Sequence, residues 1–173
     1  PPPPPAPPPS PPAPIPGAKA LVALHAQLVM GGAEADLSAW TQLLARWQVS
    51  SNEVAVKDAA RCPAKISEGL NCLRGHATLD QLARFDRPLL LHLRDGDHGG
   101  LALLQGVTAN RVRLDFAGVG YSLPRAALGE LWSGDFSVIW RLPPEVPGTL
   151  RRGDAGARPI PCALRRRARR LRR

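Results

Sequence analysis

The 173-residue chain lacks several of the features by which proteins are commonly classified. No apolar run reaches the roughly 18 residues that a transmembrane helix needs, and the run over residues 20–30 is interrupted by His25 and Gln27. No Gly-x4-Gly-Lys-Ser/Thr phosphate loop occurs, so the chain does not contain a P-loop ATPase. The start is proline-rich and does not have the pattern of a signal peptide, so we expect another segment to precede it in a longer parent protein.

Acidic residues are absent from the last ten positions, which carry seven arginines. The formal net charge is +9, but residues 1–150 contain 13 basic and 13 acidic residues, so the excess lies entirely after residue 150. The folded part is therefore not expected to bind nucleic acid specifically. The tail alone has the charge to attract phosphate, nucleic acid or an anionic membrane, and we interpret it as an unstructured basic end.

Proline divides the chain. The first 16 residues are almost pure proline, which fixes φ and removes the amide donor, so they predict an extended spacer rather than a packed element. We predict three parts: a proline-rich linker over 1–17, one domain over 18–142, and a linker with an arginine-rich tail over 143–173.

Helical periodicity precedes strand-like alternation along the predicted domain, an order typical of an α+β fold. Gly31-Gly32 should end the first helix, Asp36 or Ser38 should cap the second, and Thr78 should cap a later one. Helices or helical turns are predicted over 18–30, 37–48, 54–61, 64–69, 79–85 and 124–131. Strands are predicted over 70–73, 88–94, 100–108, 111–116, 120–123 and 136–142.

Three cysteines allow several interpretations. Cys62 and Cys72 are ten residues apart, and a disulfide between them would close a short loop in a small domain. A zinc site would need two more ligands, and only His76 is near, so we expect neither metal nor cofactor. Reactive thiols remain a third interpretation, and Cys162 is expected to be unpaired.

Two histidines are candidates for chemistry. His92 interrupts an apolar strand and is expected to face solvent, whereas His98 follows the Asp95-Gly96-Asp97 turn and is expected to be exposed. A cysteine–histidine pair between His98 and Cys62 or Cys72 is left open by the sequence.

The four tryptophans are expected to belong to the core. Trp132 is the exception to consider, because it is followed by Ser133-Gly134 and is a candidate platform for stacking against a glycan. We therefore name Trp132, Ser133, Gly134 and His98 as candidate binding residues.

Several segments together resemble a known family. From about residue 37 to 142 the chain resembles the peptidase-like domain in the periplasmic part of ExeA/GspA proteins, the ATPase components that help to assemble the type II secretion secretin. That domain is related to bacteriocin-leader-processing cysteine peptidases. The resemblance implies a papain-like α+β fold, with N-terminal helices packed on a small antiparallel sheet. The matching segments are Trp40 with Leu43-Leu44 and Trp47, Cys62, Gly69-Leu70-Asn71-Cys72-Leu73, Leu82 with Asp86-Arg87-Pro88, and Trp132-Ser133-Gly134-Asp135-Phe136 with Trp140.

The chain departs from the active relatives at two of three catalytic positions. Their nucleophilic cysteine opens the helix that corresponds to 37–48, but the segment 32–38 of this chain has no cysteine. Their histidine corresponds to Gly100 or Gly99, and only Asp115 matches the triad. The resemblance therefore implies a scaffold retained for binding, not an enzyme.

The family also implies a setting. Its arrangement is a cytoplasmic ATPase, a membrane span, a proline-rich linker, this domain and often a peptidoglycan-binding module. Residues 150–156 of this chain resemble the start of that module, and the similarity stops after them. We expect a periplasmic binding domain in a membrane-anchored parent, with a secretin, its assembly partner or peptidoglycan as ligand. An active cysteine peptidase of atypical geometry and a peptidoglycan-binding protein are the alternatives.

Overall fold

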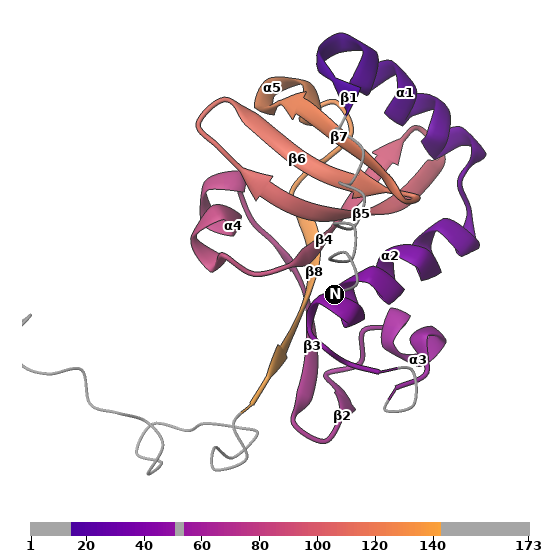
Figure 1. Cartoon of the computed structure of the whole chain (residues 1–173), viewed down its shortest axis with the longest axis vertical. Coiled ribbons are helices and arrows are strands. Elements are labelled where there is room, and N and C mark those ends of the chain that lie inside the picture. Colours follow the sequence, from indigo (N-terminus) through magenta and orange to yellow (C-terminus); the bar gives the residue numbers. More distant parts are fainter. Residues whose placement is uncertain (1–14, 51–53, 143–173) are drawn as a thin grey trace, which may run out of the picture.

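The structure is a computed structural model that describes residues 15–50 and 54–142. The predicted arginine-rich tail lies outside the described residues, as does the predicted linker up to residue 14. Eight strands form one sheet in the order β1-β7-β6-β5-β4-β8-β3-β2, antiparallel throughout except that β1 pairs parallel with β7 (Figure 1). The strands are β1 (Ile15–Pro16), β2 (Lys65–Ser67), β3 (Leu70–His76), β4 (Leu89–Asp95), β5 (His98–Val107), β6 (Arg111–Phe116), β7 (Val119–Pro124) and β8 (Asp135–Arg141).

Helices cover both faces of this sheet. Figure 1 shows α1 beside β7, whereas α2 and α3 lie toward β3 and β2. The predicted α+β fold, with N-terminal helices packed on an antiparallel sheet, is confirmed. The helices are α1 (Gly17–Met30), α2 (Ala33–Arg46), α3 (Val56–Ala60), α4 (Leu79–Phe85) and α5 (Arg125–Leu128).

Two hydrophobic cores lie on opposite faces, and the alternation of each central strand divides its side chains between them. In β4, Leu89, Leu91 and Leu93 join the core under α1 and α4, while Leu90 joins the core under α2 and α3. Strands β5 and β8 divide in the same way. The central strands are buried on both faces, which explains their nearly continuous apolar sequences.

Helix α1 buries one stripe of small and branched side chains. Ala20, Leu24 and Leu28 recur every four residues and are at most 1% exposed. The helix ends before Gly31, whose amide donates to the carbonyl of Gln27, so the predicted stop at Gly31-Gly32 is confirmed.

The predicted start of α2 is wrong. The helix begins at Ala33 after Gly32, and neither Asp36 nor Ser38 caps it. Ala33 and Glu34 favour helix, and Glu34 and Asp36 place negative charge in the first turn, where the helix dipole favours it. The carboxylate of Asp36 is bonded elsewhere, to the amide of Leu101.

The helical turn predicted over 64–69 is also wrong. Residues 65–67 form β2, and Gly69, with a φ of 71°, turns the chain into β3. Strand β3 then continues to His76 rather than ending at Leu73, because its partner β8 extends beside it over seven residue pairs.

The remaining elements agree with the predictions to within a few residues at each end. Thr78 caps α4 in a reciprocal capping box with Gln81, as predicted. Over the described ranges, no helix is both long and apolar enough to span a membrane.

Candidate functional site

A polar cleft of about 450 Å³ opens where the resemblance places the peptidase centre. It lies between the first turn of α2 and the sheet, where β4 and β8 are paired only over residues 89–91 and then separate. Its polar and glycine lining comes from several strands and segments: Asp36, Arg74, Gly75, His92, Arg94, Gly99, Gly100, Ser133 and Asp135.

Asp36 occupies the first turn of α2, within the segment that corresponds to the nucleophile of the active relatives. Its Oδ1 atom accepts a hydrogen bond of 2.9 Å from the amide of Leu101 on β5. Burial raises the pKa of Asp36, while this hydrogen bond and the nearby His92 act in the opposite direction. The carboxylate therefore ties the start of α2 to the sheet.

Gly99 and Gly100 point to opposite faces of β5. Leu101 and Leu103 face the α2 side, so Gly99 shares their face, whereas Gly100 faces α1. A Cβ atom built on Gly100 would lie 2.6 Å from the ring of Phe116, so no side chain fits there without movement. A Cβ on Gly99 would meet only the carbonyl of Leu93 at 3.7 Å. Of the two predicted positions for the histidine, Gly99 is the one beside α2.

Asp115, the one predicted triad position that matches, lies on β6 opposite Leu103 and is half-buried. Its Oδ1 atom accepts hydrogen bonds from Gln42 Nε2 at 3.3 Å and from the amide of Gly118 at 3.0 Å. The second bond closes the β6–β7 turn, in which Gly118 has a φ of 81°. Asp115 therefore links α2 to this turn.

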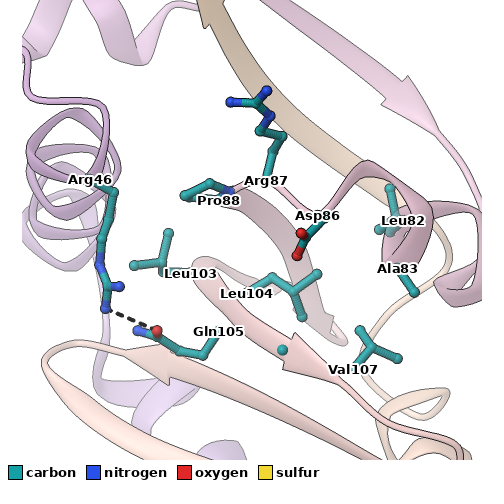
Figure 2. A pocket seen from close by; sticks show the side chains of 11 residues that line it. Arg46, Leu82, Ala83, Asp86, Arg87, Pro88, Leu103, Leu104, Gln105 and Val107 are labelled. Carbon is teal, nitrogen blue, oxygen red and sulfur yellow. Dashed lines mark hydrogen bonds between the residues drawn. The ribbon is translucent and has the colours of Figure 1, made fainter.

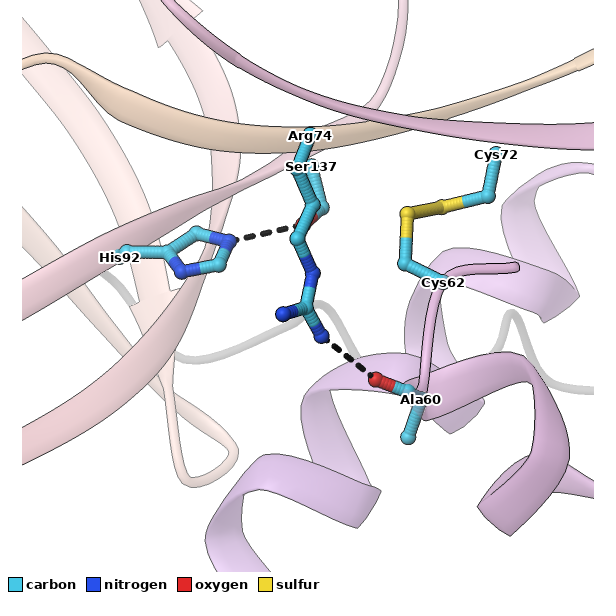
Figure 3. Close-up of a disulfide and its surroundings, with 6 residues drawn as sticks. All are labelled: Ala60, Cys62, Cys72, Arg74, His92 and Ser137. Atoms are coloured by element: carbon cyan, nitrogen blue, oxygen red, sulfur yellow. Dashed lines mark hydrogen bonds between the residues drawn. A yellow bond between two sulfur atoms is a disulfide. The ribbon is translucent and has the colours of Figure 1, made fainter. Parts of the chain in front are cut away.

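His92 is a correction to the sequence prediction. It does not face solvent but is half-buried at the cleft, and its Nε2 atom lies 2.7 Å from Ser137 Oγ (Figure 3). Burial lowers the pKa of His92, and the positive charge of Arg74 lowers it further, so the neutral ring is favoured. Ser137 is 0% exposed, so the hydroxyl beside this imidazole is not accessible to a peptide substrate.

The predicted disulfide between Cys62 and Cys72 is present and joins the chain just after α3 to β3 (Figure 3). Two residues beyond Cys72, the guanidinium of Arg74 donates to the carbonyl of Ala60 at the end of α3. Because both sulfurs are consumed by the bond, the cysteine–histidine pair with His98 that the sequence left open does not form. Within the described ranges, no three His, Cys, Asp or Glu side chains gather as metal ligands.

His98 is exposed and lies outside the lining of the cleft. It begins β5 opposite Asp95, whose carboxylate is 2.7 Å from His25 Nδ1 on α1. The sequence does not point to Ser137 or Arg74 and misplaces His92, because only the pairing of β3, β4 and β8 brings the three side chains together.

The predicted binding residues Trp132, Ser133 and Gly134 form a turn that is held by its own hydrogen bonds. Trp132 Nε1 donates to the carbonyl of Asp135 at 2.8 Å, and Ser133 Oγ donates to its carboxylate. Gly134 has a φ of 118°, and a Cβ there would lie 2.5 Å from the ring of His76. The hydrogen bond from His76 lowers the pKa of Asp135. A groove of about 450 Å³ borders this turn, and glycan stacking by Trp132 stays a prediction.

A further cavity of about 270 Å³ lies between the end of α2 and the α4–β4 connection (Figure 2). Its two arginines diverge rather than converge: Arg46 donates to Gln105 Oε1 at 3.0 Å, and the Arg87 guanidinium stacks 5.6 Å from the ring centre of Trp47. The pair is therefore not arranged to clamp one anion.

Sequence comparison finds two relatives of this chain. It is 28% identical over 88 residues to general secretion pathway protein A of Aeromonas hydrophila, and 26% identical over 98 residues to the provisionally named general secretion pathway protein A of Escherichia coli (strain K12). The matches cover 50% and 57% of this chain but 16% and 20% of the relatives, so the chain spans about a fifth of their length or less. No protein-family model matches the chain.

A solved structure shows the same fold. The structure has a TM-score of 0.53 and 19% identity to a periplasmic domain of the EpsAB fusion protein of the Vibrio vulnificus type II secretion system, covering 65% of this chain and 51% of that one. The N-terminal peptidase-like domain of the toxin secretion ATP-binding protein from Vibrio parahaemolyticus matches more remotely, at a TM-score of 0.39, 16% identity, 70% of this chain and 93% of that chain.

The fold is an α+β domain that shares its architecture with a periplasmic domain of a type II secretion protein. The predicted resemblance to the peptidase-like domain of ExeA/GspA proteins is confirmed, and the chain is related to the periplasmic domains of these type II secretion proteins.

Proposed function

We propose that this domain is a non-catalytic, peptidase-like binding module that acts in the periplasm during assembly of the type II secretion apparatus. The observation that carries the proposal is the bonding at the position of the peptidase centre. Asp36 lies in the first turn of α2 and accepts a hydrogen bond from the amide of Leu101. Gly99 has no side chain to place beside Asp36.

The chemistry of this arrangement differs from that of a cysteine peptidase. Such an enzyme needs a thiolate and an imidazole within about 3 Å of it, oriented by a third group. The one imidazole in the cleft, His92, is bonded to the buried Ser137, and the described cysteines are joined to each other. Peptide or protein binding needs none of these groups.

The names of the relatives support a place in secretion. Both curated relatives are general secretion pathway proteins, and the matched structure is a periplasmic domain of a type II secretion system. We infer that the parent protein is membrane-anchored and that the ligand is a secretin, its assembly partner or peptidoglycan.

Absence of catalysis is tested with double-glycine leader peptides incubated with the purified chain. We expect no cleavage product above the level of a buffer control. Cleavage that disappears in Cys62→Ser or Cys72→Ser would establish the active-peptidase alternative instead.

Binding is tested by pull-down on peptidoglycan sacculi and on a purified secretin at low and high salt. A chain that ends at residue 150 serves as the matched control, because it removes ten arginines and leaves a part with equal numbers of acids and bases. Specific binding should persist in this shortened chain at high salt, since exposed charges are screened beyond about 10 Å at 0.1 M salt. Loss of all binding on shortening would show that the domain is not the binding module.

A further inference from the structure

Strand β3 has one paired edge and one open edge. Its inner side pairs with β8 along its whole length, from Leu70 opposite Arg141 to His76 opposite Asp135. Its outer side pairs with β2 only at Leu70 and Asn71, and the amide of Cys72 donates to Ala64. Beyond Cys72, β2 does not continue beside β3 (Figure 1).

The direction of the main-chain groups follows from alternation along β3. The amide of Cys72 points outward to Ala64, whereas that of Ala77 points inward to the carbonyl of Gly134. Residues two apart share a side in an antiparallel strand, so the N–H and C=O groups of Arg74 and His76 point outward. Within the described ranges, the outward N–H and C=O groups of Arg74 and His76 form no backbone hydrogen bond. Such an edge is a template for an added strand.

An apolar groove of about 530 Å³ follows the same stretch of β3 on its α4 side. Leu73 of β3 and Phe85 of α4 are each 50% exposed along it, and the ring of Phe136 forms its floor, 6.3 Å from that of Phe85. Gly75 leaves this floor open, since a Cβ there would lie 2.9 Å from the Phe136 ring. Exposed apolar side chains that gather in this way are typical of an interaction site.

Arg84 is the residue of permanent charge that lines this groove, and no carboxylate lines it. The other ionisable lining residue, His76, has its Nδ1 atom 3.1 Å from the Asp135 carboxylate, outside the groove lining. Arg84 lies on α4 next to Phe85, so a negative group on a bound segment would meet it at the end of the groove.

We propose that the outer edge of β3 and the adjoining groove bind an extended segment of another protein. The segment adds as a strand beside residues 73–76, places an apolar side chain between Leu73 and Phe85, and sets a carboxylate beside Arg84. The open main-chain groups select an extended backbone, the groove selects alternate apolar residues, and the arginine selects an acid. This assignment rests on the binding part of the proposed function and names its site.

The test begins with a phage-displayed library of random nonapeptides selected on the whole chain, and the affinity of the enriched peptides is then measured on variants. Arg74→Pro removes an outward amide, and Arg74→Ala is its matched control because it keeps that amide. Phe85→Asp places an acid in the groove, and Met30→Asp is its control at an apolar residue that is 74% exposed on α1. Native folding of each variant is verified by amide NMR spectra.

We expect the selected peptides to have apolar residues at alternate positions and to carry an acidic residue. Arg74→Pro and Phe85→Asp should each reduce their affinity for the chain about tenfold. Arg84→Glu should weaken peptide binding most at low salt. Both control variants should bind the peptides as the wild type does. Failure to enrich any peptide, or affinities that Phe85→Asp leaves unchanged, would overturn the proposal. A dimer of the chain that Arg74→Pro dissociates would assign the edge to a second copy and also overturn it.

The two proposals fail separately. If Phe85→Asp and Arg84→Glu retain full binding to sacculi or secretin, the binding function stands and the β3 site is wrong. If the wild-type chain binds neither but binds selected peptides at β3, the site stands and the secretion partners are wrong.

Discussion

The Oδ1 atom of Asp36 accepts a 2.9 Å hydrogen bond from the amide of Leu101, and this bond joins the first turn of α2 to β5. The resemblance to papain-like peptidases implies that in them this junction is where the nucleophile on the helix meets the base on the strand. In this domain a carboxylate and a main-chain amide meet instead, and the contact is one that stabilises a fold.

Substitution Asp36→Asn should stabilise the domain at neutral pH. Burial raises the pKa of Asp36 above its ordinary value of 3.8, so the folded state holds the proton more tightly than the unfolded state. Stability from this group is complete below pH 3.8 and is lost as the pH rises through the folded-state pKa. Asparagine keeps the acceptor for Leu101 without the charge. Urea unfolding should show Asp36→Asn more stable than wild type at neutral pH, with the difference vanishing in acid.

Glu34→Gln is the control for this comparison, because Glu34 is exposed in the same helical turn. The difference in unfolding free energy between Glu34→Gln and wild type should not change with pH in the way expected for Asp36→Asn. A destabilised Asp36→Asn at neutral pH would mean that the folded state favours the charged carboxylate, which contradicts a raised pKa for Asp36.

His92 should make the domain less stable in mild acid. Burial and Arg74 lower the pKa of His92 below its ordinary value of 6.5, and Asp135 and Asp36 offset this only in part. The unfolded state therefore binds the proton first, so stability is complete above pH 6.5 and falls as the pH falls toward the folded-state pKa. NMR titration of the ring should give a pKa below 6.5, and His92→Gln should flatten the stability profile below pH 6.5. His98→Gln, at an exposed position, should leave the profile unchanged; an identical effect of both variants would refute the assignment.

These histidines show what the sequence can and cannot predict. The short apolar runs of β4 and β5, bounded by charged and glycine turns, predict both strands to within two residues, because such a run is a property of each strand alone. The surroundings of His92 depend on Ser137, 45 residues away, and on a helix that covers the second face of the sheet. An isolated strand pattern contains neither piece of information, so it wrongly places His92 in solvent.

Reduction of the disulfide should weaken the domain measurably. The bond between Cys62 and Cys72 closes a loop with a sequence separation of 10 residues and holds the end of α3 against β3. In the chain-entropy model a loop of this length stabilises by about 2–3 kcal/mol, so Cys62→Ser with Cys72→Ser should lower the free energy of unfolding by that amount. The control is Cys162→Ser, which should have no effect. If wild type with and without reductant unfolds at the same denaturant concentration, the bond does not stabilise this fold.

Adding a thiol and an imidazole at the two positions that the resemblance matches to the peptidase centre should show which face of β5 lies beside α2. Asp36→Cys places a thiol at the first turn of α2, and Gly99→His adds an imidazole on the same face, beside the cleft that both positions line. An imidazolium near a thiol favours the thiolate, so the double variant should alkylate with a lower thiol pKa than Asp36→Cys alone. The matched control combines Asp36→Cys with Gly100→His, which faces α1 and would collide with Phe116. This control should either fail to fold stably or leave the thiol pKa as in the single variant. Equal thiol pKa values in the single variant and in the Gly99→His double variant would show that position 99 does not correspond to the histidine of the peptidases.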